Sequence, residues 1–143
     1  QIKTNFMATL NPYLTFKGNC KEAMGFYKEI FGGELSLMTA GESPVASQMP
    51  ASYHNSILHS SLKTENFEIM ATDMVPGEFI EGNTVHMSLA CKTEEEMRSL
   101  FEKLSAGGNV NHAINQMFFG LLGDLTDKFG KHWILEFDSP QKD

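Results

Sequence analysis

The sequence predicts an α+β fold in which two βαβββ modules form a curved mixed sheet with the helices on its convex side. Three observations predict it. Each half of the chain contains one helix with a one-sided apolar stripe that ends at a Gly-Gly pair. Each helix follows one strand-like stretch and precedes three others. The second half also repeats the order of the first: Thr84 takes the place of Asn11, and Met97 that of Met24, a shift of 73 positions.

The first module is predicted to begin with a strand over residues 11–16, where Pro12 suits a strand start. A helix over Cys20–Phe31 follows, with Asn19 as its N-cap and Gly32-Gly33 as its end. Its apolar residues recur at the spacing of a helix that buries one face: they are Ala23, Met24, Phe26, Tyr27, Ile30 and Phe31. Further strands are predicted over residues 34–39, 56–63 and 67–72.

The second module is predicted to start with a strand over residues 84–91, and its helix starts at a capping box made by Thr93 and Glu96. The buried stripe of this helix is Met97, Leu100, Phe101 and Leu104. Three strands follow, over residues 109–115, 119–126 and 132–137. Alternation along the strands predicts that Val85, Met87, Leu89, Cys91 and Trp133 face the core.

We expect a single domain over residues 7–143, with module one at 7–73, a linker at 74–83 and module two at 84–138. Residues 1–6 precede Met7 and are expected to be a cloning remnant or a loose arm. The stretch 39–55 has little periodicity and contains two prolines. A loop of that length is either a lid over a site or a disordered surface loop.

Charge and composition exclude several classes of partner. Eleven Lys and Arg residues against 18 Asp and Glu give a net charge of −7, and no basic patch is present. Nucleic acid and anionic membranes are therefore not expected as partners. No apolar run approaches the roughly 18–20 residues of a membrane span. The two cysteines form no CxxC motif, so we expect no disulfide framework and a cytoplasmic location.

Several short motifs in a fixed order carry a family resemblance: Asn11-Pro12-Tyr13-Leu14, Gly18-Asn19-Cys20, Phe26-Tyr27-Lys28-Glu29, Phe31-Gly32-Gly33-Glu34, and Asp127-Lys128-Phe129-Gly130 followed by Trp133. Together they resemble the PhnB-like branch of the vicinal-oxygen-chelate (glyoxalase/bleomycin resistance/dioxygenase) superfamily, from about Met7 to Phe137. Members of this branch often carry a 3-demethylubiquinone 3-methyltransferase-like label. The chain has no Gly-rich strand-to-helix turn that would seat a nucleotide-like methyl donor, so its residues do not support that activity.

The resemblance implies where a metal would be held. Metal enzymes of the superfamily place His, Glu or Gln on the first, fourth, fifth and eighth strands, which here correspond to residues 11–13, Met70, His86 and Ile134. Only His86 is an ordinary ligand, whereas a divalent ion needs about three or more protein donors. We therefore expect no metal cofactor. The resemblance also implies a homodimer.

Individual residues suggest the lining of a cleft. His86 is predicted to point into it, as a metal ligand or as a histidine that bonds a strand or a ligand. His59 is either a cleft-facing base or a solvated strand histidine. Glu136 shares the face of Ile134, so a displaced metal set of His59, His86 and Glu136 is a further possibility. The predicted cleft residues are His59, Met70, His86, Gln116, Phe119, Ile134 and Glu136.

Other residues receive simpler interpretations. Gln116 and Phe119 lie in a segment where the related branch often shows Asp-x-Phe-Trp-Gly, and Phe119 is either a ligand platform or core. His54 and His112 are expected at the surface, and His132 is expected on the cleft face without a partner. Neither cysteine can be placed beside a base, so no thiol nucleophile is expected.

These observations favour a metal-free protein that binds a small organic molecule in an apolar cleft. The alternative is a metal-dependent lyase, dioxygenase or transferase with an atypical ligand set. A third possibility is a dimeric scaffold whose cleft is filled by its own side chains. Sequence does not identify the ligand, nor whether a reaction is catalysed.

Overall fold

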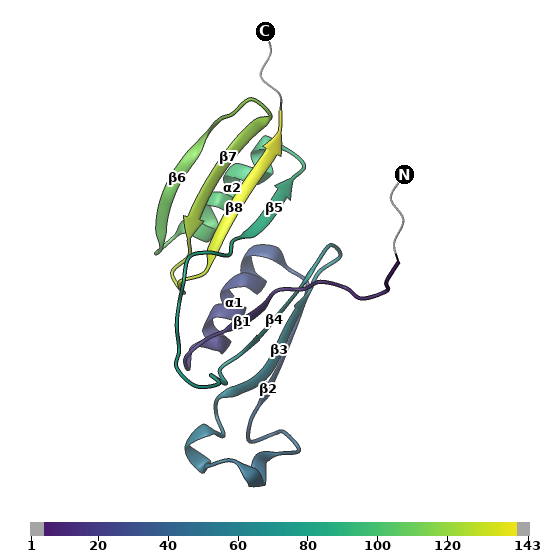
Figure 1. The fold of residues 1–143 in the computed structure, drawn as a ribbon, viewed down its shortest axis with the longest axis vertical. Coiled ribbons are helices and arrows are strands. Elements are labelled where there is room, and N and C mark those ends of the chain that lie inside the picture. Colours follow the sequence, from purple (N-terminus) through teal and green to yellow (C-terminus); the bar gives the residue numbers. More distant parts are fainter. Residues whose placement is uncertain (1–4, 140–143) are drawn as a thin grey trace. The chain divides into compact units, whose positions relative to one another are not determined.

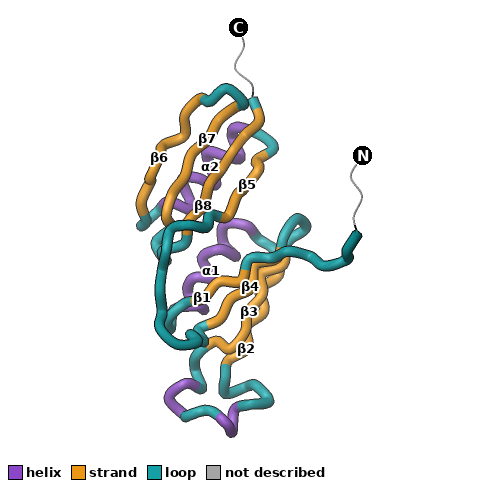
Figure 2. The backbone as a smooth tube through the Cα atoms, viewed as in Figure 1, coloured by secondary structure: helices purple, strands orange, loops and turns teal. Residues whose placement is uncertain are grey.

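The computed structural model describes residues 5–139, and its chain divides into two compact units, one ending at Phe79 and the other beginning at Ile80. Each unit contains one helix and one four-stranded sheet (Figure 1 and Figure 2). The order of elements is βαβββ in both units, and each sheet mixes parallel and antiparallel pairs. The α+β, two-module prediction is therefore confirmed.

The first unit comprises β1 (Tyr13–Thr15), α1 (Cys20–Phe31), β2 (Glu34–Thr39), β3 (Ile57–Lys63) and β4 (Glu68–Thr72). Its strand order is β1-β4-β3-β2, with β1 parallel to β4. The second unit comprises β5 (Met87–Cys91), α2 (Glu94–Ser105), β6 (Asn109–Gln116), β7 (Gly120–Thr126) and β8 (His132–Asp138). Its order is β5-β8-β7-β6, with β5 parallel to β8.

The start of α1 differs from the prediction. Asn19 precedes the helix, but its side chain makes no capping hydrogen bond among the described residues, and its ψ of 24° is not that of an extended cap. The carboxylate of Asp73, the residue after β4, caps the start of α1 instead. Its Oδ1 accepts from the backbone N–H groups of Gly18 (2.9 Å) and Cys20 (3.0 Å), and its Oδ2 accepts from that of Ile57 (2.9 Å). One carboxylate therefore joins the helix start to the sheet.

The two remaining predictions about helix ends are confirmed. Oγ1 of Thr93 accepts from the backbone N–H of Glu96 at 3.0 Å, while Oε1 of Glu96 accepts from that of Lys92 at 2.9 Å. At the end of α1, Gly32 has a φ of 73° and donates its N–H to the carbonyl of Lys28. A positive φ favours glycine, which explains why the helix ends there.

The core of each unit lies between its helix and one face of its sheet. In the second unit the most buried side chains are Met97, Leu104, Leu125, Trp133 and Leu135. The prediction for Val85 was wrong: it is 77% exposed, because β5 begins only at Met87 and the preceding residues lie outside the sheet. Gly123 permits close packing here, since a Cβ would lie 2.9 Å from the ring of Phe101 on α2.

A buried carboxylate also organises the turn between β7 and β8. Asp127 is 2% exposed, and its Oδ2 accepts from Nε1 of Trp133 at 2.8 Å. Its Oδ1 accepts from the backbone N–H groups of Phe129 (2.8 Å) and Lys131 (3.0 Å). This network explains why the Asp-Lys-Phe-Gly motif is followed by a tryptophan, and it confirms Trp133 as a core residue.

The long loop between β2 and β3 contains two short 3₁₀ helices, η1 (Ala46–Gln48) and η2 (Ala51–Tyr53). Nε2 of His54 lies 3.0 Å from the carbonyl oxygen of Ala46 and 3.3 Å from that of Met49. His54 is therefore a half-buried residue that holds the loop together, and the prediction of a plain surface histidine was wrong. Whether the loop acts as a lid stays a prediction.

Of the predicted arm at residues 1–6, residues 1–4 lie outside the described part of the chain. Phe6 and Met7 are 70% and 99% exposed, in a segment that forms no helix or strand.

Replacing Asp127 tests the network at the β7–β8 turn. Asp127→Asn keeps the shape but offers only one acceptor oxygen for donors that now use two, so we expect a loss of about 2–3 kcal/mol in the free energy of unfolding. Urea denaturation followed by the fluorescence of Trp133 measures it. Asp138→Asn, an exposed change of the same kind, should shift stability by less than about 0.5 kcal/mol. Equal midpoints for the two variants would contradict the assignment.

Candidate functional site

The second sheet carries a hollow of about 450 Å³ on the face that points away from α2. Alternation along β7 produces this face: Leu121 and Leu125 are buried on the helix side, so Leu122 and Asp124 point the opposite way. Ile134 does the same on β8, between the buried Trp133 and Leu135. The hollow is lined by His86, His112, Asn115, Met117, Leu122, Gly123, Asp124 and Ile134.

Strand register brings residues from three strands together at this hollow. Asp124 pairs with Ile134 of β8 on one side and with His112 of β6 on the other. Leu122 pairs with Asn115 of β6 one step along. The result is an apolar floor, formed by Leu122 and Ile134, beside a polar group centred on Asp124.

The polar group is a carboxylate between two imidazoles. Oδ1 of Asp124 lies 2.6 Å from Nδ1 of His112, and its Oδ2 lies 3.8 Å from Nε2 of His86. The Asp124 side chain is 17% exposed, against 33% for His86 and 82% for His112. Solvent screening at such an exposed imidazole leaves the pair little effect on stability. Its importance is geometric, because a carboxylate that only accepts requires the proton of His112 to sit on Nδ1.

His132 does have partners, contrary to the sequence prediction. Its Nδ1 lies 2.9 Å from Oγ1 of Thr126 and its Nε2 lies 3.0 Å from the carbonyl oxygen of Gly82. The ring is 5.3 Å from that of His86, centroid to centroid. With both nitrogens engaged, His132 anchors the segment before β5, and a nearby ion pair between Lys131 and Glu81 (3.4 Å) supports the same contact.

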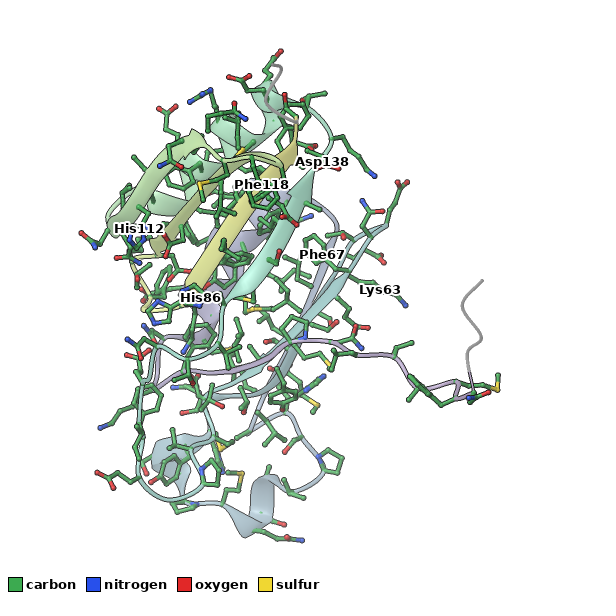
Figure 3. All side chains as sticks on the ribbon, turned by 45° about the horizontal axis from the view of Figure 1, so that its top comes forward. Lys63, Phe67, His86, His112, Phe118 and Asp138 are labelled. Carbon is green, nitrogen blue, oxygen red and sulfur yellow. The ribbon has the colours of Figure 1, made fainter. Side chains whose placement is uncertain are left out.

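Of the other residues predicted for the cleft in this module, Ile134 lines the hollow, and Gln116, Phe119 and Glu136 are not among its lining residues. The amide of Gln116 donates to the carbonyls of Met117 (2.8 Å) and Ser139 (3.1 Å), so it links the β6–β7 turn to the residue after β8. Phe119 packs edge to face against Phe118 in that turn. Phe118 itself is 82% exposed and is labelled in Figure 3. Glu136 pairs with Leu122 and Ala90, on the same face but farther along the strands.

The two predicted cleft residues of the first module lie on one sheet. Tyr13 of β1 pairs with Met70 of β4, and the ring of His59 from β3 lies 6.0 Å from the ring of Tyr13. Ser61 of β3 pairs with Met70 and donates a hydrogen bond to Glu68 at 2.7 Å. These contacts place an imidazole, a phenol ring and a thioether near one another on the first sheet.

The side chains present do not fit a resident divalent metal. Within residues 5–139, no three His, Cys, Asp or Glu side chains are arranged to hold a metal ion. In the displaced set, Glu136 pairs with Ala90, which is four residues beyond His86 in sequence. At about 3.3 Å per residue, His86 and Glu136 start roughly 13 Å apart along the strands. Nε2 of His86 faces Asp124 instead.

Sequence reasoning missed most of the hollow. Asp124, Leu122, Asn115 and Met117 were not proposed. His112 was expected at the surface, where its side chain is indeed 82% exposed, but it was not proposed for the hollow. Alternation along β7 carries a signal for Leu122 and Asp124. Nothing in the sequence signals the pairing of Asp124 with His112, because the β6–β7 register shifts on both sides of His112.

Both cysteines are buried and poorly suited to act as nucleophiles. Burial raises the pKa of the Cys20 thiol to about 11, although Oγ of Ser60 lies 3.5 Å from its sulfur and partly offsets the shift. Burial also raises the pKa of the Cys91 thiol to about 11, with Glu96 and Glu136 adding to it. A thiolate is therefore scarce at neutral pH.

The order and pairing of the helices and strands identify the fold of the chain. The chain has the two-module fold of the glyoxalase/bleomycin resistance/dioxygenase group. It shares this fold with a glyoxylase/bleomycin resistance protein/dioxygenase domain from Frankia sp. EAN1pec, which has a TM-score of 0.64 at 14% identity over 94% of this chain and 100% of that one. Among the described residues, neither helix is long and apolar enough to cross a bilayer.

The particular family follows from closer matches. The family model described as 3-demethylubiquinone-9 3-methyltransferase matches residues 8–135. The crystal structure of protein PA1353 from Pseudomonas aeruginosa is similar, with a TM-score of 0.81 and 33% identity over 92% of this chain and 98% of that one. Protein YjdN of Escherichia coli (strain K12) is 29% identical over 136 residues, 88% of this chain and 92% of its own. The chain belongs to this 3-demethylubiquinone-9 3-methyltransferase family.

Thiol alkylation tests the burial of the two cysteines. Because a pKa of about 11 leaves little thiolate at neutral pH, we expect Cys20 and Cys91 to react with iodoacetamide more than about a hundredfold more slowly than a free thiol. Mass spectrometry of timed samples gives both rates, and labelling should accelerate as the pH approaches about 11. The unfolded protein in urea is the control. Labelling of either cysteine at the free-thiol rate in the folded protein would refute the assignment.

Proposed function

We propose that this chain binds a small organic molecule in the hollow of the second module, without a resident metal ion. One observation carries the proposal: a hollow of about 450 Å³ combines an apolar floor with a small polar group on one side. Small-molecule sites commonly have volumes of about 300–1,000 Å³ and this mixture of apolar lining and few polar groups.

The apolar floor supplies the affinity in this proposal. Leu122 and Ile134 lie on neighbouring strands and form its centre, with Met117 at the turn beyond them. Each 100 Å² of apolar surface that a ligand covers contributes about 2.5 kcal/mol before the costs of association are deducted. The flexible Met117 can adapt to ligands of different outline.

The polar group supplies orientation. Asp124, His86 and His112 offer a carboxylate and two imidazoles, and Asn115 adds an amide from β6. The hollow therefore fits an apolar molecule with one hydrogen-bonding substituent better than a uniformly polar one. A polar group of the ligand placed against Ile134 would lose its hydrogen bonds to water without gaining others.

A metal-dependent lyase, dioxygenase or transferase is the alternative. The observation that supports it best is that two imidazoles, which are ordinary metal ligands, flank the carboxylate of Asp124. Against it, no three His, Cys, Asp or Glu side chains among residues 5–139 are arranged to hold a metal ion. The homodimer and the cytoplasmic location expected from the sequence stay predictions.

Metal content separates the two classes. Elemental analysis of protein purified without an affinity tag, before and after soaking in Zn²⁺, Mn²⁺, Fe²⁺ and Ni²⁺ followed by desalting, should find far less than stoichiometric metal, because the hollow lacks a converging donor set. Retention of near-stoichiometric metal that is lost in His86→Ala would replace the proposal by the metal-dependent alternative.

A thermal-shift screen of small apolar and anionic molecules tests the site itself. A ligand present at about 100 times its Kd stabilises the folded chain by about 2.7 kcal/mol. We expect Ile134→Lys to abolish this stabilisation, since it places a charge on the apolar floor. Ile80→Lys makes the same exchange at a residue that is 78% exposed and should leave it intact. A hit stabilised equally in both variants binds elsewhere and would count against the hollow.

A further inference from the structure

We infer that His112, oriented by Asp124, accepts a proton from a weakly acidic hydroxyl group, such as a phenol or an enol, on the molecule bound in the hollow. The inference rests on the proposed function and deepens it by naming the ligand's chemical class. It assigns a role to a residue that the sequence placed at the surface.

The hydrogen bond between Asp124 and His112 fixes which nitrogen can act. Since Oδ1 of Asp124 only accepts, the short contact of 2.6 Å puts the proton of a neutral His112 on Nδ1. The opposite nitrogen, Nε2, then carries a lone pair. The side chain of His112 is 82% exposed while that of Asp124 is 17% exposed, so the imidazole stands at the mouth of the site and the carboxylate lies beneath it.

A second imidazole lies on the other side of the carboxylate. Nε2 of His86 is 3.8 Å from Oδ2 of Asp124, which is beyond hydrogen-bonding distance, and the His86 ring lies beside that of His132, which is itself bonded through both nitrogens. His112 is therefore the imidazole to which Asp124 is hydrogen-bonded. A carboxylate that fixes the tautomer of an imidazole and stabilises its protonated form is the arrangement that makes histidine an effective base.

The position of this pair relative to the floor defines the ligand. Asp124 pairs directly with Ile134 and with His112, so the base lies across one strand from the apolar surface. A flat apolar ring on Leu122 and Ile134 with a hydroxyl toward β6 satisfies both parts of the hollow. Asn115, on the same strand as His112, can donate its amide to the oxygen after the proton has moved.

The proposed step is a simple proton transfer. The O–H bond of the ligand breaks, its electron pair stays on the oxygen, and an N–H bond forms at Nε2 of His112. The products are a ligand oxyanion and an imidazolium whose charge is balanced by Asp124. Release of the ligand with its proton restores the starting state, so the step needs no oxidant or further reactant.

Other ionisable groups share this face with His112. They are Asp124 on β7, His86 before β5, and His132 and Glu136 on β8.

The test uses 4-nitrophenol, whose anion has a visible absorbance that its neutral form lacks, and 4-nitroanisole, its methyl ether, which has no proton to give. We expect the wild-type protein to bind 4-nitrophenol and to show the anion's absorbance at a pH where the free phenol is largely neutral. His112→Gln, which can form hydrogen bonds but cannot take the proton, should abolish that signal. It should weaken 4-nitrophenol binding about tenfold or more, and 4-nitroanisole binding less than about twofold.

Asp124→Asn provides the positioning test. Its amide can donate to Nδ1 of His112, which reverses the tautomer and removes the lone pair from Nε2, so this variant should also lose the anion signal while still binding 4-nitroanisole. Asp138→Asn, the same chemical change at an exposed residue outside the hollow, should retain the signal.

If the compounds bind, either of two results would overturn the inference: an anion signal that survives in His112→Gln, or binding of 4-nitroanisole with no preference for the phenol. The second result would leave the proposed function standing. Failure of both compounds to bind would overturn the assignment of this ligand class. The proposed function is tested independently by comparing ligand stabilisation of Ile134→Lys and Ile80→Lys.

Discussion

Each sheet is covered by its helix on one face only, and this constraint decides where function can reside. A helix of 12 residues covers one side of a four-stranded sheet, and alternation sends every second strand residue to the other side. On β7 and β8 the helix-facing positions are filled by leucine and tryptophan, which form the core. The opposite positions are free of that packing requirement. Leu122, Asp124 and Ile134 can therefore serve a ligand without weakening the core.

Two carboxylates fix the elements that form these cores through hydrogen bonds between residues distant in the sequence or across a turn. Asp73 joins the start of α1 to the first sheet, and Asp127 joins the β7–β8 turn to Trp133 in the second core. The second one bears directly on the hollow. The turn that Asp127 stabilises sets the register in which Asp124 lies opposite Ile134. The structural carboxylate of Asp127 therefore helps to position the carboxylate of Asp124 in the hollow. The register, and with it the site, depends on a turn several residues away.

Local sequence patterns were sufficient to predict nearly every helix and strand. They failed where the structure depends on contacts between residues far apart in the sequence. The stripe of α1, the Thr93 capping box and the Gly32 stop are all encoded within a few neighbouring residues, which is why the sequence reveals them. The cap of α1 comes from Asp73, 53 positions from Cys20, and no local pattern announces it. The site followed the same rule. His86 was predicted from alternation and Ile134 from the family resemblance, whereas the partnership of His112 and Asp124 depends on irregular pairing between two strands.

The composition of the hollow suggests how a metal-binding fold can acquire a different chemistry. The resemblance places a ligand of the superfamily's metal enzymes at Ile134, and a branched apolar side chain there cannot donate to an ion. Asp124 is the direct neighbour of Ile134 on the adjacent strand and shares its face. There it is hydrogen-bonded to His112 and lies 3.8 Å from Nε2 of His86. A carboxylate hydrogen-bonded to one nitrogen of an imidazole fixes which nitrogen carries the lone pair. The apolar Ile134 on one neighbouring strand and His112 on the other are therefore the arrangement on which the proposed proton transfer rests.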